Sequence, residues 1–88
     1  MRVVIHSNKL ARQFAEYRIS YRRFDEAFMD TERALSSHPE IFPKVPETTL
    51  SRVKLVPFNG VPPLSIFFTF DDSTVTLHFA SIIDEDEE

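Results

Sequence analysis

Four side chains suited to chemistry lie at alternating positions in the second half of the chain. Lys54, Phe67 and His78 each sit between apolar residues, and Arg52 lies between Ser51 and Val53. Residues two apart in a strand share a face, so strands here would place all four on one side, with the hydroxyls of Ser65, Thr69, Thr74 and Thr76. Cations neutralise phosphate, a base stacks on an aromatic ring, and imidazole titrates near neutral pH. We therefore take Arg52, Lys54 and His78 as candidate catalytic residues and Phe67 as a candidate binding residue. The alternative is a solubilising sheet face.

Other chemistries lack their residues in this sequence. The chain has no cysteine and one glycine, which excludes thiolate sites and a glycine-rich phosphate loop. Its histidines at positions 6, 38 and 78 are not at metal-ligand spacing. We expect no metal and no cofactor.

A second cluster of basic residues precedes these segments. Arg18, Arg22 and Arg23 follow Arg12, with Tyr17 and Tyr21 among them. Such a cluster is a candidate docking patch for an acidic partner or nucleic acid. A solvated helix surface is the alternative.

Apolar periodicity predicts two helices after a short strand over residues 3–5. Leu10, Phe14, Tyr17 and Tyr21 recur at helical spacing after a capping Ser7 or Asn8. A break is expected near residues 19–20. A second apolar stripe runs from residue 24 to 35, and Pro39 requires that helix to stop by residues 37–39. Residues 38–49 contain three prolines and are expected to be an extended connection.

The remaining residues alternate with period two and predict an antiparallel meander of three strands. Turns are expected at Asn59-Gly60 and at Asp71-Asp72-Ser73. The side chains expected to face the helices are Val53, Leu55, Leu64, Ile66, Phe68, Val75, Leu77 and Phe79. The fold class is therefore α+β in β-α-α-β-β-β order, with two helices on one face of a small, mainly antiparallel sheet.

Charge is unevenly distributed along the 88 residues. Residues 1–54 hold all ten basic residues and seven acidic ones, whereas residues 55–88 hold seven acidic residues and no basic ones. The net charge of −4 therefore does not exclude a polyanionic partner. We expect a single domain over residues 1–83 and an acidic, disordered tail over 84–88, either a solubility tail or an arm that covers a basic surface. No apolar stretch is long enough to cross a membrane, so we expect a cytoplasmic protein.

Residues 2–80 resemble the RelE/ParE toxin superfamily of bacterial toxin–antitoxin systems. The resemblance rests on the element order and on residues 2–6, 35–39, 52–55, 64–72 and 74–78. It implies a small toxin held inactive by an antitoxin protein, acting on messenger RNA in the ribosome or on DNA gyrase. It also implies that Lys54 contacts the scissile phosphate region, with Arg52 as its neighbour.

The chain departs from the RNA-cleaving members of this superfamily at two places. Residues 64–66 contain no basic residue where those members carry an arginine, and Ile82-Ile83 with the acidic tail replace their basic and aromatic residues. Losing a cation that stabilises transition-state charge costs about 3 kcal/mol. The leading hypothesis is therefore a toxin-family protein that acts by macromolecular binding.

Two alternatives remain open, and with them the question whether this is an enzyme. One is an active ribosome-dependent endoribonuclease that uses Lys54, Arg52 and His78. The other is a non-toxin interaction module or homodimer, with an interface at Phe67 and Val56.

Overall fold

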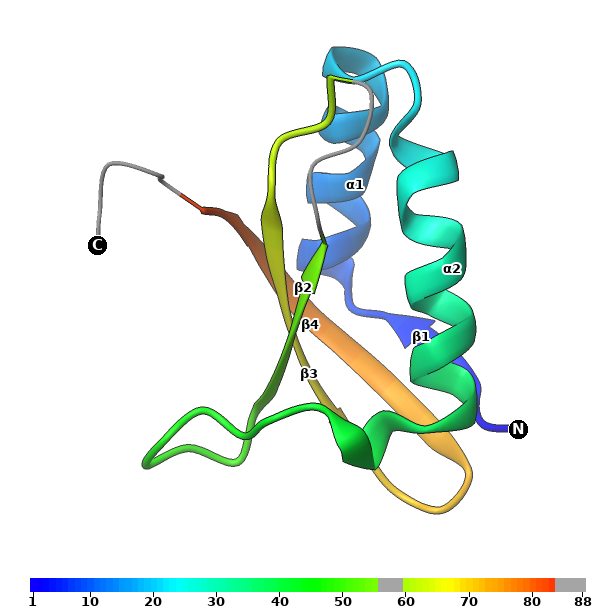
Figure 1. The fold of residues 1–88 in the computed structure, drawn as a ribbon, viewed down its shortest axis with the longest axis vertical. Coiled ribbons are helices and arrows are strands. Elements are labelled where there is room, and N and C mark those ends of the chain that lie inside the picture. The colour runs from blue at the N-terminus through cyan, green and yellow to red at the C-terminus, as the bar shows by residue number, and fades with distance from the viewer. Residues whose placement is uncertain (56–59, 84–88) are drawn as a thin grey trace.

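The computed structural model describes residues 1–55 and 60–83 and contains two helices and a four-stranded sheet (Figure 1). This confirms the predicted α+β class and the β-α-α-β-β-β order. The element bounds are β1 (Val3–His6), α1 (Asn8–Ser20), α2 (Phe24–Ser37), the 3₁₀ turn η1 (Pro39–Ile41), β2 (Ser51–Leu55), β3 (Leu64–Phe70) and β4 (Thr74–Ile82).

The sheet has the strand order β1-β4-β3-β2. Strand β3 pairs antiparallel with both β2 and β4, which confirms the predicted meander. Strand β1 pairs parallel with β4, from Val3 opposite Thr74 to His6 opposite Leu77. The sheet is thus mixed, and the first strand closes it at the side away from β2.

Local chemistry marks the start of α1 and the end of α2. The Oγ of Ser7 accepts a hydrogen bond from the Leu10 N–H at 3.1 Å, so Ser7 is the N-cap of α1. The predicted break is confirmed, since α1 ends at Ser20 and α2 starts at Phe24. Helix α2 ends at Ser37. Pro39 then starts η1, so the connection expected to be wholly extended contains one short 3₁₀ turn.

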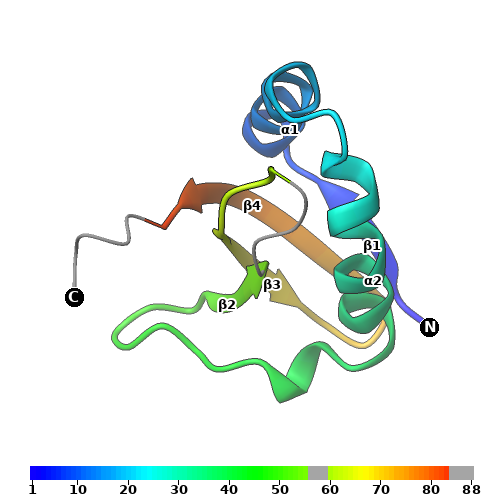
Figure 2. The ribbon, with the colours of Figure 1, turned by 45° about the horizontal axis from the view of Figure 1, so that its top comes forward.

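Both helices pack on the same face of the sheet (Figures 1 and 2). Phe14 and Phe24 are fully buried, with ring centroids 4.8 Å apart, and they join α1 to α2. The buried core consists of Leu10, Phe14, Phe24, Phe28, Leu35, Val53, Leu55, Val61, Leu64, Ile66, Phe68, Val75, Leu77 and Ala80. The opposite face of the sheet carries no helix in the part of the chain that the structure describes, and we call it the open face.

Beyond the end of β1, side chains at the start of α1 hydrogen-bond the backbone of β4. Strand β1 ends at His6, and the Oγ of Ser7 then donates to the His78 carbonyl at 2.6 Å. Further along β4, the Gln13 side chain donates to the Ala80 carbonyl and accepts from the Ala80 N–H, at 2.9 and 2.8 Å. These bonds supply the pairing that a longer β1 would have made. They also bring the start of α1 beside the sheet.

The predicted turn between β3 and β4 is confirmed and is organised by Asp71. Its Oδ1 accepts hydrogen bonds from the Ser73 N–H and the Thr74 N–H, both at 2.8 Å, and from the Thr74 hydroxyl at 2.9 Å. Bonds to the charged form lower the pKa of this carboxyl from 3.8 to about 2.

Ionised Asp71 should therefore stabilise the fold in a defined range of pH. A carboxyl with a lowered folded-state pKa contributes its full stability above the unfolded value near 3.8, and this is lost as the pH falls towards 2. In urea unfolding, Asp71→Asn should be less stable than the parent at pH 5, and the difference should shrink by pH 2. Asp72→Asn makes the same charge change without these bonds. An equal effect from Asp72→Asn would contradict this role of Asp71.

Some sequence predictions fall outside the described residues. These are the acidic tail over 84–88, Val56, and the Asn59 half of the predicted turn. Gly60 is described, and its φ of 91° is the conformation expected of a turn glycine. Neither helix in the described part of the chain is long and apolar enough to cross a membrane.

Candidate functional site

A β-bulge in β4 determines which side chains reach the open face. Phe67 pairs with Phe79 but Phe68 pairs with Leu77, so His78 is an extra residue on β4. The prediction that Phe79 faces the helices is therefore wrong. The extra residue shifts the alternation by one position, which places Phe79 beside Phe67 and buries Ala80 in the core instead.

The bulge creates an aromatic pair at the centre of the open face. The rings of Phe67 and Phe79 stack with centroids 4.7 Å apart and an interplanar angle of 24°. The Nζ of Lys9, at the start of α1, lies 5.1 Å from the Phe79 centroid, within the range of a cation–π contact. Lys9 was not among the predicted site residues. It reaches this face because α1 packs along the edge of β4 beyond β1.

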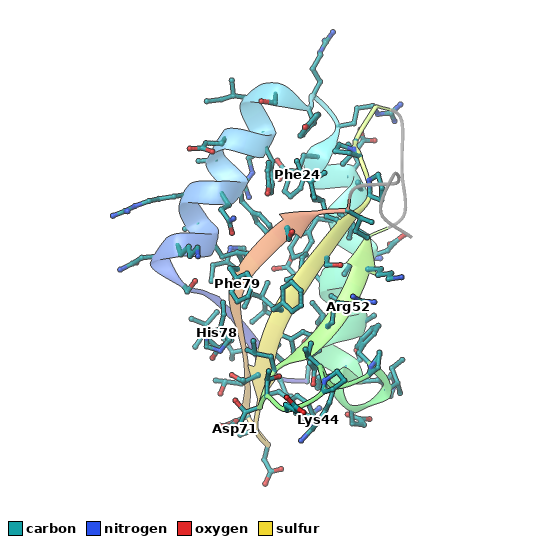
Figure 3. All side chains as sticks on the ribbon, turned by 90° about the vertical axis from the view of Figure 1, so that its left-hand side faces the viewer. Phe24, Lys44, Arg52, Asp71, His78 and Phe79 are labelled. Carbon is teal, nitrogen blue, oxygen red and sulfur yellow. The ribbon has the colours of Figure 1, made fainter. Side chains whose placement is uncertain are left out.

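Arg52 on β2 lies opposite Phe67 on β3, and it borders a hollow of about 360 Å³. Figure 3 looks onto this face, with Arg52 above Lys44 and with His78 and Phe79 on β4. The segment before β2 forms the other wall, because the Pro43 carbonyl accepts from the Arg52 N–H at 2.9 Å. The lining residues are Pro43, Lys44, Val45, Pro46, Arg52 and Phe67. The hollow thus combines an apolar lining with two cations.

Four cations of the open face have no carboxylate partner in the described part of the chain. Among the described residues, Lys9, Lys44, Arg52 and Lys54 form no ion pair. By contrast, four arginines elsewhere are paired: Arg2 with Glu40, Arg18 with Asp25, Arg23 with Glu26, and Arg33 with Asp30. The positive charge of the open face is therefore not neutralised by the described part of the protein.

The three candidate catalytic residues all lie on the open face, but they are not clustered at one point on it. The Nε2 of His78 lies 2.8 Å from the Thr69 hydroxyl. Lys54 lies in line with Ser65 and Ser81 across the sheet, three residues along β4 from His78. Strand spacing and rise then separate the Lys54 and His78 backbones by about 14 Å. Arg52 lies between them, beside the aromatic pair.

The candidate binding residues Arg18, Arg22 and Arg23 lie at the corner between the helices. The Nε of Arg18 donates to Asp25 Oδ1 of α2 at 2.7 Å. Arg23 donates two hydrogen bonds to the Glu26 carboxylate, at 2.6 and 2.8 Å. Arg22 is exposed. The ion pair between Arg18 and Asp25 links α1 to α2, so this geometry favours a structural role for Arg18 over docking.

The other two histidines have structural surroundings. His6 makes edge contacts with the rings of Phe14 and Phe28, and His38 follows the last residue of α2. In residues 1–55 and 60–83, no three metal-binding side chains come together.

No protein-family model matches this chain, and no curated protein matches its sequence.

Proposed function

We propose that this protein is a RelE/ParE-like toxin that acts by binding single-stranded RNA on its open face without cutting it. The observation that carries the proposal is the set of four cations around the aromatic pair, Lys9, Lys44, Arg52 and Lys54, which have no carboxylate partner among residues 1–55 and 60–83. The β-α-α-β-β-β order supports the toxin resemblance. An antitoxin protein is the partner that this resemblance implies.

The chemistry of the open face suits a single strand better than a duplex. Proteins that bind single strands combine a cationic groove with aromatic side chains on which bases stack. Here the hollow beside Phe67 offers apolar surface between Lys44 and Arg52. With four phosphate contacts, the logarithm of the binding constant should fall with the logarithm of salt concentration with a slope of about −3.

The geometry of the same face favours binding over RNA cleavage. General acid–base catalysis requires two proton-transferring groups within hydrogen-bond reach of one bond. The His78 ring is hydrogen-bonded to the Thr69 hydroxyl, and the backbones of His78 and Lys54 are about 14 Å apart. Strand β3 carries no cation that could stabilise a pentacoordinate phosphate between them.

Inducible expression in bacteria tests the proposal. We expect growth arrest that is relieved by Arg52→Ala, with transcripts that remain intact by primer extension. Arg22→Ala, which changes an exposed arginine away from the open face, should still arrest growth. Arrest that Arg52→Ala does not relieve would contradict the proposal, and relaxed DNA in arrested cells would point to DNA gyrase as the target.

A ribosome-dependent endoribonuclease is the second candidate. It is favoured by the placement of Arg52, Lys54 and His78 on one face. Transcripts cut during arrest, with cutting lost in both Lys54→Ala and His78→Ala, would support it.

A non-toxin homodimer is the third candidate. Val3 and Ile5 on β1 are 63% and 45% exposed, which leaves an apolar strip at one edge of the sheet. Light scattering that shows a concentration-independent dimer, together with no effect on growth, would support this candidate.

A further inference from the structure

We propose that the acidic segment 84–88 of this chain occupies the open face and competes there with polyanions. The inference concerns regulation of the face described above, and it rests on the proposed function only for the identity of the competing ligand. Its contact with the face can be measured with no ligand present.

The position of Ile83 places the start of this segment within reach of the open face. The Ile83 N–H donates to the Pro63 carbonyl at 2.9 Å, which holds the end of β4 beside the start of β3. Two residues earlier, Ser81 pairs with Ser65, which pairs with Lys54. Strand spacing and rise place Ile83 about 12 Å from Lys54. Five extended residues span about 17 Å, which is enough to reach Lys54.

Opposite charge makes the open face the place where this segment is expected to bind. All five residues from 84 to 88 are acidic. In the described part of the chain, four cations without carboxylate partners lie on the open face, whereas Arg18 and Arg23 at the helix corner are paired and Arg12 and Arg22 are two separate exposed cations on the helix side. Tethering keeps the acidic segment at millimolar effective concentration near this face. Weak, exposed ion pairs are then sufficient for competition at low salt.

A spin label detects the contact directly. The chain has no cysteine, so Glu88→Cys provides a single labelling position. At 0.05 M salt we expect the label to broaden the amide signals of Arg52, Lys54 and Phe67 (on the order of three- to fivefold loss of intensity), and this should disappear at about 1 M salt because the charges are screened. Signals of α2 should be unaffected. Broadening confined to residues 80–83, or equal on both faces, would overturn the inference.

Binding of a fluorescent ten-nucleotide oligouridylate measures the competition. Removing residues 84–88 should raise the affinity about tenfold at 0.05 M salt, the scale expected from two or three exposed ion pairs acting together. Asp84→Asn with Glu85→Gln should raise it about threefold. The matched control, Glu16→Gln with Asp30→Asn, removes the same charge from exposed helix positions and should change it less than 1.5-fold.

The two experiments separate the possible failures. If the shortened and full chains bind RNA equally well, the competition is refuted and the proposed function stands. If neither chain binds RNA, the proposed function fails, and the salt-dependent broadening still decides whether the acidic segment occupies the open face. If the helix control raises the affinity as much as Asp84→Asn with Glu85→Gln, the effect is one of net charge and the inference is wrong.

Discussion

Reversing two charges on the open face, as Arg52→Glu with Lys54→Glu, is expected to weaken binding of a single-stranded RNA by 30- to 100-fold at 0.05 M salt (an order-of-magnitude estimate). Both side chains are on β2, opposite Phe67 and Ser65, and neither has a carboxylate partner in residues 1–55 and 60–83. Each substitution removes a phosphate contact and adds repulsion. The salt dependence should weaken too: the slope of the logarithm of the binding constant against the logarithm of salt concentration should change from about −3 to about −1.5.

A matched double variant controls for net charge. Arg12→Glu with Arg22→Glu makes the same change at exposed positions on and after α1. Its affinity should fall by less than about threefold, since neither residue lies on the sheet or lines the hollow beside Phe67. Anisotropy titrations at three salt concentrations provide both numbers. Equal losses in the two double variants would show that RNA senses overall charge and has no site on the open face.

Truncating one aromatic ring of the core should remove a large part of the stability of the fold. Phe14 is fully buried and contacts the rings of Phe24 and Phe28 at centroid distances of 4.8 and 4.9 Å. We expect Phe14→Ala to lower the free energy of unfolding by about 3–5 kcal/mol, from lost burial and the cavity left behind. A domain of this length has a total of about 4–13 kcal/mol, so this loss is at least about a quarter of the total.

Urea unfolding measures this loss. Phe14→Leu keeps most of the buried volume and should lose about 1–1.5 kcal/mol. Ile19→Ala, at a side chain 85% exposed, should change the stability by less than about 0.5 kcal/mol. A loss below about 1.5 kcal/mol for Phe14→Ala would mean that the ring cluster does not hold the helices on the sheet.

Most elements of this fold were predictable because their signals are local. The apolar spacing of Phe14 and Phe24 indicates helices, Ser7 and Pro39 mark helix boundaries, and the alternation around Val53 and Ile66 indicates strands. The pairing of β1 with β4 was not predictable. A four-residue strand carries no pattern that names its neighbour 70 residues later.

The same distinction explains what was found and missed at the site. Arg52, Lys54, Phe67 and His78 were assigned to one face by alternation, and the structure places them there. Phe79 was assigned to the wrong face, since an unbroken alternation in β4 gives no sign of the extra residue at the bulge. Lys9 and Lys44 were missed because their approach to this face depends on how α1 and the segment before β2 pack against the sheet.

A ¹H–¹⁵N titration with a ten-nucleotide single-stranded RNA tests most directly whether the open face is the binding site. The largest shift changes should fall on Arg52, Phe67 and Phe79, and on Lys44 across the hollow. Signals of α2 should hardly move, because this helix lies on the other face of the sheet. Shift changes centred on the helix corner at Arg22, or none at millimolar RNA, would contradict RNA binding at the open face.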